Sequence, residues 1–287
     1  MISLVEHTDE IGGIPVFWRE AGSKRTGGKG APGVSGDDAA GRSPVLYVHG
    51  VPDSSDLWVP FLERGGGIAV DLPGFGRSGK RADLDYSIAG YDRFLEDFLD
   101  HAGVERLRLV VHDWGTAALA FAQRFPERIE RLVIADGVPL LPGYRWHRIA
   151  RLWRARGVGE LFMGGASRWG QRLLSREGNA TPGPMPESYL ASVWSHFDAG
   201  TQRAILRLYR SAPADALARA GIGLGEILCP ALVLWGAEDP YLPPSFARAY
   251  ADALGGDAEH EVVEAAGHWP WIDRSELVGR IVDFATA

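Results

Sequence analysis

The sequence predicts an α/β fold in which a mostly parallel β-sheet is covered by helices on both faces. Apolar runs of strand length recur along the chain, at residues 46–48, 68–70, 107–111, 132–134 and 231–235. Amphipathic segments of helical period lie between and after them, at residues 86–101, 116–125, 244–254 and 276–284. Strands that alternate with helices in this way pair in parallel and are buried on both faces. Catalytic side chains then belong at the carboxyl ends of the strands.

Length and composition narrow the class of protein. The 287 residues are 46% hydrophobic and 23% charged, so the chain can bury a sizeable core as one large domain or two small ones. The net charge of -7 argues against binding to the phosphate backbone of nucleic acids. No apolar run reaches the about 20 residues of a membrane-spanning helix, and residues 1–10 lack the apolar core of a signal peptide. The single Cys229 forms no internal disulfide, and these features predict a cytoplasmic protein without a nucleic-acid or membrane partner.

Two stretches interrupt the alternation of strands and helices. Residues 22–42, which follow a predicted hairpin at residues 4–18, are rich in Gly, Lys and Ser and are predicted to form a flexible loop without a function. Residues 139–215 carry several tryptophans and helical patterns but no convincing strand. We predict that this segment is a helical lid over the catalytic edge of the sheet. The core domain then consists of residues 1–138 and 216–287.

A glycine-rich segment comes close to two phosphate-binding motifs without completing either. Gly74, Gly76 and Gly79 match G-x-G-x-x-G, but further residues separate the third glycine from any helical pattern. Lys80 follows this glycine as in a Walker A loop, but Arg81 stands where Ser or Thr would hold magnesium. The His, Glu and Cys spacing of a metal site is also absent from the sequence. We therefore predict neither a metal ion nor an organic cofactor.

The strongest motif is L-V-V-H-D-W-G-T-A-A at residues 109–118. An apolar strand ends at a single polar apex, Asp113, and Gly115 with small neighbours opens a helix. This pattern is typical of a nucleophile elbow, a strained turn that exposes its apex side chain. Taken alone, it also fits an aspartate that caps the following helix. His112 is interpreted as a packed neighbour of the elbow.

Further motifs lie just after the ends of other predicted strands or in loops near them. The loop of H-G-V-P at residues 49–52 can aim the Val51 N–H at the same point as the Trp114 N–H, and two such donors form an oxyanion hole. Asp239 comes just after a late strand, in G-A-E-D. His268 lies in a Gly-His loop before the last helix. The order nucleophile, acid, histidine is that of a hydrolase with a nucleophile elbow.

Together, H-G-x-P, D-x-P-G-x-G-x-S, H-D-W-G, G-x-x-D and G-H resemble the motifs of the α/β-hydrolase fold superfamily. The resemblance is to its aspartate-nucleophile branch, which holds epoxide hydrolases and haloalkane dehalogenases, and it covers nearly the whole chain except residues 22–42. It implies the α/β-hydrolase fold, a mostly parallel sheet flanked by helices with an inserted helical lid. It also implies a catalytic triad of Asp113, Asp239 and His268.

An aspartate suits this chemistry because an ionised carboxylate can attack a saturated carbon without first losing a proton. We expect Asp113 to form an alkyl-enzyme ester in this step. His268 then activates the water that hydrolyses the ester, and Asp239 orients His268. Glu238 and Asp136 remain alternative acids, since some dehalogenases that resemble this chain carry the acid after the earlier strand, where Asp136 lies.

The lid determines which leaving group is assisted. An epoxide oxygen needs a proton donor, and the segment L-R-L-Y-R around Tyr209 resembles the Tyr-Arg segment late in epoxide hydrolase lids. A halide needs N–H donors in a dry pocket, which in similar dehalogenases come from the Trp matching Trp114 and from a second Trp or an Asn. Trp169 is the candidate second Trp, either as a halide ligand or as a donor near the leaving oxygen. Val51 stands where many dehalogenases carry Asn, which favours the epoxide.

The sequence thus predicts a hydrolase that opens an epoxide to a diol, with Tyr144 and Tyr189 as candidates for a second tyrosine. Haloalkane dehalogenation by the same triad is the alternative. Ester or lactone hydrolysis is a weaker alternative, because a carboxylate that attacks a carboxylic ester forms an anhydride, and this step gains little. A ligand-binding protein on a hydrolase scaffold is the non-enzymatic alternative. The tryptophan-rich lid predicts an apolar, ring-bearing small molecule as the substrate. The oligomeric state stays open, with a homodimer as one alternative.

Overall fold

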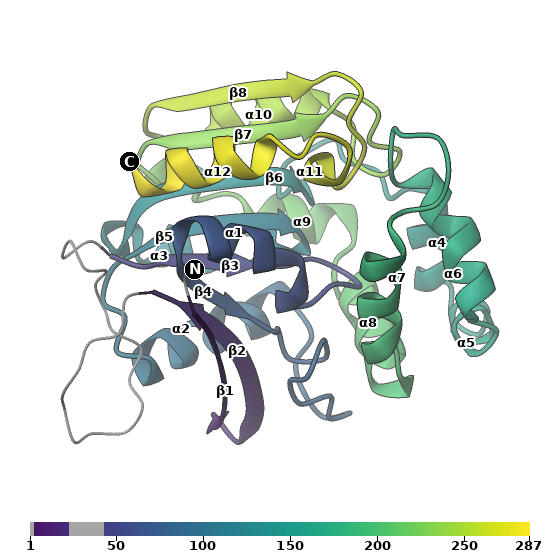
Figure 1. The fold of residues 1–287 in the computed structure, drawn as a ribbon. Helices are drawn as coiled ribbons and strands as arrows, with labels where there is room; N and C mark the ends of the chain where they lie inside the picture. The colour runs from purple at the N-terminus through teal and green to yellow at the C-terminus, as the bar shows by residue number, and fades with distance from the viewer. Residues whose placement is uncertain (1–2, 23–42) are drawn as a thin grey trace.

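An eight-stranded β-sheet runs through the computed structural model, which describes residues 3–22 and 43–287 (Figure 1). The strands are β1 (Leu4–Ile11), β2 (Ile14–Ala21), β3 (Val45–Val48), β4 (Gly67–Val70), β5 (Leu107–Asp113), β6 (Ile129–Gly137), β7 (Ala231–Gly236) and β8 (Ala258–Val263). They lie in the order β1-β2-β4-β3-β5-β6-β7-β8, and only the β1–β2 and β2–β4 pairs are antiparallel among these strands. The predicted α/β fold with a mostly parallel sheet is confirmed.

The first two strands form a hairpin that turns through two glycines. Gly12 and Gly13 have φ of 58° and 75°, and a two-residue hairpin turn of type I′ requires positive φ at both positions. Ile11 and Ile14 are the last pair of residues before this turn. The loop predicted at residues 22–42 lies outside the described residues, apart from Gly22.

The sequence patterns do not predict β8. Four of its six residues are exposed, because β8 is an edge strand that pairs only with β7. An exposed edge strand carries no apolar run, which is the signal that predicts the central strands.

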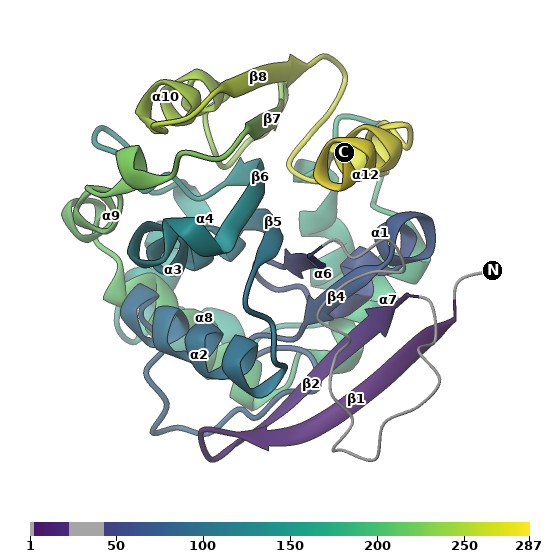
Figure 2. The ribbon, with the colours of Figure 1, turned by 90° about the vertical axis from the view of Figure 1, so that its left-hand side faces the viewer.

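Helices cover both faces of the sheet (Figure 2). Those of the core are α1 (Val59–Gly65), α2 (Ile88–His101), α3 (Ala118–Arg124), α10 (Ser245–Ala253), α11 (Pro270–Asp273) and α12 (Leu277–Thr286). α1 and α12 pack against each other on one face, while α2, α3 and α10 lie on the other. The central strand β5 is buried between them: Leu109 and Val111 belong to the core under α2 and α3, and Val110 belongs to the core under α1 and α12.

A helical segment is inserted between β6 and β7. It contains α4 (Arg148–Arg154), α5 (Val158–Gly164), α6 (Arg168–Leu174), α7 (Glu187–His196), α8 (Ala199–Ser211) and α9 (Ala214–Ala220). Helices α4 to α8 lie beyond the carboxyl ends of the parallel strands, at the right of Figure 1. α9 runs across the boundary predicted at residue 215. Within the described part of the chain, no helix combines the length and apolarity needed to cross a membrane.

Candidate active site

Asp113 ends β5 in a strained turn. Its φ is 49°, a left-handed value that non-glycine residues rarely adopt outside functional sites. Two glycines allow the close approach around it: a Cβ at Gly50 would overlap the Asp113 side chain, and one at Gly115 would overlap the Val48 carbonyl oxygen. The Thr116 hydroxyl donates to the Asp113 carbonyl oxygen at 2.9 Å and holds the turn. The residue at the apex of this turn therefore presents its carboxylate in a fixed position.

The two carboxylate oxygens of Asp113 have different surroundings. Oδ2 accepts a hydrogen bond from the Val51 N–H at 2.8 Å, and Oδ1 lies 3.8 Å from His268 Nε2. Burial raises the pKa of the Asp113 carboxyl, although the charge of His268 lowers it in part. The backbone N–H groups of Val51 and Trp114 also favour the ionised form. Oδ1 is thus the oxygen available for attack, while Oδ2 lies where an oxyanion would be stabilised.

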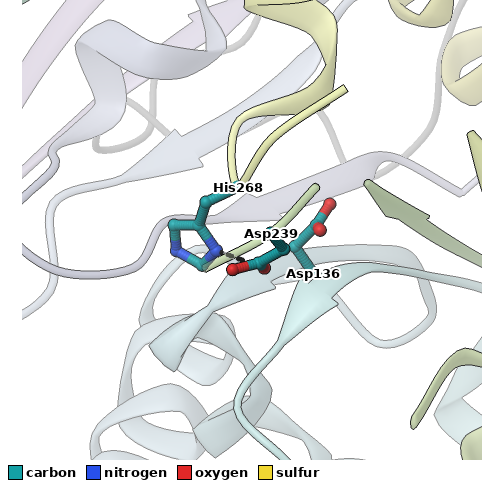
Figure 3. Close-up of side chains that lie close together, drawn as sticks. All are labelled: Asp136, Asp239 and His268. Carbon is teal, nitrogen blue, oxygen red and sulfur yellow. Dashed lines mark hydrogen bonds and ion pairs between the residues drawn. The ribbon is translucent and has the colours of Figure 1, made fainter. Parts of the chain in front are cut away.

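His268 is oriented by Asp239. Its Nδ1 donates to Asp239 Oδ2 at 2.8 Å, and both side chains are buried (Figure 3). Asp239 Oδ1 accepts the backbone N–H groups of Tyr241 and Leu242 at 2.7 and 3.0 Å, which leaves the carboxylate little freedom. Burial alone lowers the pKa of His268, but the charge of Asp239, the hydrogen bond to it and the charges of Asp113 and Asp53 outweigh burial and raise it.

Asp136 and Glu238, the alternative acids, do not bind His268. Glu238 is exposed. Asp136 is fully buried beside Asp239 (Figure 3); its Oδ1 accepts the Gly236 N–H at 2.8 Å, and its Oδ2 has no partner among the described residues. Burial and the charge of Asp239 raise the pKa of Asp136 well above its usual value.

One group of side chains has the spacing of metal ligands. The ligand atoms of Asp136, Asp239 and His268 lie within 4.8 Å of one another. A metal ion here would compete for the His268 nitrogen and the Asp239 oxygen that already bond to each other. The arrangement therefore fits a histidine oriented by a carboxylate better than a metal centre.

His112 is more than a packed neighbour of the elbow. It is fully buried, and its Nε2 donates to the His268 carbonyl oxygen at 2.8 Å. Burial lowers the pKa of His112 well below its usual value, so its ring stays neutral. The hydrogen bond ties the strand that carries Asp113 to the loop that carries His268.

A cavity of about 550 Å³ opens above Asp113 and His268. Its apolar lining comes mostly from the inserted helices and includes Trp146, Ile149, Trp153, Phe162, Met163, Leu174, Leu190, Val193 and Phe197. Pockets of this size that are lined by apolar and aromatic side chains bind small apolar molecules. The apolar lining is therefore compatible with the apolar small molecule that the sequence predicts as the substrate.

Tyr209 on α8 lines this cavity and is buried. Its ring packs against three indoles, with centroid distances of 5.1 Å to Trp114, 4.9 Å to Trp146 and 4.9 Å to Trp153. Its hydroxyl donates no hydrogen bond to any residue that the structure describes. Burial, and after it the charge of Asp113, raises the pKa of Tyr209 well above its usual value, so the hydroxyl keeps its proton.

The structure does not bring Trp169 to the site, which corrects the sequence prediction. Gly170, Gln171, Leu173 and Leu174 of α6 line the cavity, whereas Trp169 does not line it and is 74% exposed.

Two other indoles are better placed than Trp169. The Nε1 of Trp114 and that of Trp153 are buried; Trp153 Nε1 has no acceptor within the described residues, and the Trp114 indole lies near the Tyr209 hydroxyl, whose pKa it lowers in part. Trp153 lines the cavity. Among the other candidate tyrosines, Tyr189 lines the cavity, and the Tyr144 hydroxyl lies 3.5 Å from the Tyr241 carbonyl oxygen.

Asp53 is a buried carboxylate at the site that the sequence analysis missed. It accepts hydrogen bonds from the Tyr189 hydroxyl at 2.8 Å and from the Trp269 indole N–H at 2.9 Å. It thereby connects α7 of the inserted segment to the residue that follows His268. Burial raises the pKa of Asp53 to about 6, and the charge of Asp113 adds to this shift. Local sequence offers no signal for it, because both partners are remote in the chain.

We expect Asp53→Asn to change how stability depends on pH. A carboxyl whose pKa rises from 3.8 to about 6 on folding stabilises the fold below pH 4, and that contribution is lost as the pH rises through 6. The shift corresponds to about 3 kcal/mol. Urea unfolding at a series of pH values should show the variant gaining about this much relative to wild type between pH 4 and 8. A difference that is constant with pH would contradict the shifted pKa.

Known proteins resemble the chain in both sequence and fold. A family model described as alpha/beta hydrolase fold matches residues 43–161. A haloalkane dehalogenase of Bradyrhizobium diazoefficiens is 28% identical over 95% of this chain and 93% of its own. Epoxide hydrolase 3 of Mus musculus is 26% identical over 80% of this chain and 66% of its own. The crystal structure of a haloalkane dehalogenase from Bradyrhizobium elkani, 26% identical, superimposes with a TM-score of 0.78 over 99% of this chain and 98% of its own.

The order of the strands, the turn at Asp113 and these matches agree with one another. The chain has the α/β-hydrolase fold, and its sequence resembles the dehalogenase-like branch of the α/β-hydrolase superfamily, which supports a hydrolase.

Proposed function

We propose that the protein hydrolyses an epoxide to a diol through a covalent ester on Asp113. The observation that carries this proposal is the Tyr209 hydroxyl, which keeps its proton, lines the same cavity as Asp113 and has no acceptor among the described residues. Ring opening produces an alkoxide, and an alkoxide needs such a donor. The apolar lining supports an apolar substrate.

In the first step, Asp113 Oδ1 attacks an epoxide carbon. The new ester C–O bond forms as the ring C–O bond breaks, and the ring oxygen takes the proton of Tyr209. The second oxygen, Oδ2, stays on the Val51 N–H. The products of this step are a hydroxyalkyl ester of Asp113 and the Tyr209 phenolate.

In the second step, His268 Nε2 takes a proton from water, and the hydroxide attacks the ester carbon of Asp113. The N–H groups of Val51 and Trp114 stabilise the negative charge that develops on the ester oxygen. When the intermediate collapses, the bond to the substrate breaks, and the departing oxygen takes the proton from His268. The acid that remains on Asp113 loses its proton, which restores the Tyr209 hydroxyl.

Haloalkane dehalogenation is the second candidate function. Two observations favour it: several relatives are haloalkane dehalogenases, and the buried Trp153 indole N–H, which belongs to a residue lining the cavity, lacks an acceptor within the described residues. A halide takes no proton, so N–H donors alone assist its departure. In this alternative, Trp153 has the role that the sequence suggested for Trp169, and the ester on Asp113 is hydrolysed as above.

A substrate panel tests the proposal directly. Purified protein and an Asp113→Ala control are incubated with matched aryl epoxides and bromoalkanes, and diol is measured by chromatography and halide by an ion-selective electrode. We expect diol without halide from the wild type and neither product from the control. Halide without diol would replace the proposed function with the second candidate.

A further inference from the structure

Exposed apolar side chains gather on the inserted helices α4 to α6, which also contribute to the lining of the cavity. Ten large hydrophobic side chains are well exposed in the described part of the chain, and six of them lie within residues 152–174. We call these six the mouth patch: Leu152, Val158, Leu161, Trp169, Leu173 and Leu174. Leu161 is 78% exposed and Trp169 is 74% exposed, so these side chains contribute little to the core. A cluster of this kind marks a surface that contacts something other than water.

The mouth patch is continuous with the apolar wall of the cavity. Leu161, Leu173 and Leu174 are exposed and also line the cavity. Trp169 and Leu173 lie one helical turn apart on α6, and residues with this spacing share a helix face. Figure 1 shows α4, α5 and α6 at the end of the molecule that is farthest from the sheet. The patch therefore lies at the outer end of the protein, where a flat partner could reach it.

The same segment is strongly basic, although the whole chain is acidic. Residues 145–177 contain eight arginines and two glutamates, whereas the net charge of the chain is -7. Both glutamates are already paired, Glu160 with Arg210 and Glu177 with Arg148. Arg151, Arg156 and Arg176 are exposed and form no ion pair with any described residue. The patch is thus surrounded by uncompensated positive charge.

We propose that the mouth patch docks on the surface of an anionic lipid bilayer. Trp and Leu side chains enter the boundary between headgroups and acyl chains, while arginines bind the anionic headgroups. A second copy of this chain fits less well, because a symmetric contact through this patch would place arginines against arginines. This proposal departs from the sequence prediction of no membrane partner. It does not conflict with the helix lengths, because docking on a surface needs no membrane-spanning helix.

Docking has a consequence for the supply of substrate. The exposed leucines lead directly into the cavity, so an apolar molecule dissolved in the bilayer could enter without crossing water. This consequence rests on the proposed function, whereas the docking does not. Binding to vesicles is therefore measured without substrate, and its failure would leave the hydrolase proposal untouched.

The test is co-sedimentation of the full chain with lipid vesicles. We expect binding to mixed phosphatidylcholine and phosphatidylglycerol vesicles, little binding to pure phosphatidylcholine, and weaker binding as salt rises. Val158→Ser/Trp169→Ser should bind vesicles at least tenfold more weakly, because it removes two exposed apolar side chains from the patch. Neither side chain lines the cavity, so the double substitution leaves the cavity lining unchanged. The matched control is Ile222→Ser, which changes an 82% exposed side chain outside the patch and should bind as the wild type does.

A second variant separates the contribution of charge. Arg151→Glu/Arg156→Glu should weaken binding by about fivefold or more for each residue. No binding to anionic vesicles, equal binding to both lipid compositions, or equal binding by the patch and control variants would overturn the proposal. Sedimentation velocity without lipid provides the last check: a dimer that Val158→Ser/Trp169→Ser dissociates would assign the patch to a second copy instead.

Discussion

His268→Gln should stop the reaction after one ester has formed on Asp113. In the proposed mechanism, His268 takes no part in the first bond, because the carboxylate attacks without a base. Its Nε2 is needed only to activate water for the second step, and Gln cannot accept that proton. We expect turnover to fall by about 10³-fold or more while the first step continues. Intact-protein mass spectrometry after mixing with substrate should detect the trapped ester.

The mass of the adduct also separates the two candidate functions. An epoxide adds its whole mass to the protein, because ring opening expels nothing. A haloalkane adds its mass less that of the hydrogen halide. Asp113→Ala is the control and should carry no adduct with either substrate. A His268→Gln protein that turns over at the wild-type rate, or an adduct on a residue other than Asp113, would contradict the mechanism.

The role of His268 in ester hydrolysis can also be tested through the pH dependence of the wild-type reaction. Asp239, Asp113 and Asp53 raise the pKa of His268 despite its burial. A base with a raised pKa is lost to protonation at a higher pH than an ordinary histidine. Ester hydrolysis in the wild type should therefore slow as the pH falls, and the ester should accumulate in acid without any substitution.

Local patterns in the sequence are sufficient for the central sheet and for the elbow. The buried strand at Leu107–Asp113 is an apolar run, and the small residues after it permit the tight turn at Asp113. Choosing between Asp136 and Asp239 is harder, because both lie at the carboxyl ends of neighbouring strands of the same sheet. Only the 2.8 Å contact between His268 Nδ1 and Asp239 Oδ2 distinguishes them.

The inserted helices are where prediction from sequence fails. Trp153 and Trp169 lie on similar short helices, and which indole faces the cavity depends on how each helix is rotated against its neighbours. Tertiary packing determines that rotation. Asp53 was missed for a related reason: its partners Tyr189 and Trp269 are 136 and 216 residues further along the chain. No pattern within a short window can indicate contacts of that range.

Tyr209→Phe should separate epoxide opening from dehalogenation in a single variant. Removing the hydroxyl leaves the new alkoxide without a proton donor, so we expect epoxide turnover to fall by about 10²- to 10³-fold. A halide takes no proton, so any bromoalkane turnover should change little. Initial rates with both substrates, together with thermal midpoints to confirm folding, provide the measurement.

Tyr144→Phe is the matched control for this variant. Tyr144 is also a buried tyrosine near the site, with a pKa raised by burial and by the charge of Asp113, but it does not line the cavity. It should therefore retain the wild-type epoxide rate. If Tyr209→Phe and Tyr144→Phe lost equal activity, the loss would reflect packing around the Trp146 ring, which contacts both tyrosines. If Tyr209→Phe slowed both substrates equally, Tyr209 would bind the substrate and would not be the acid that protonates the leaving oxygen.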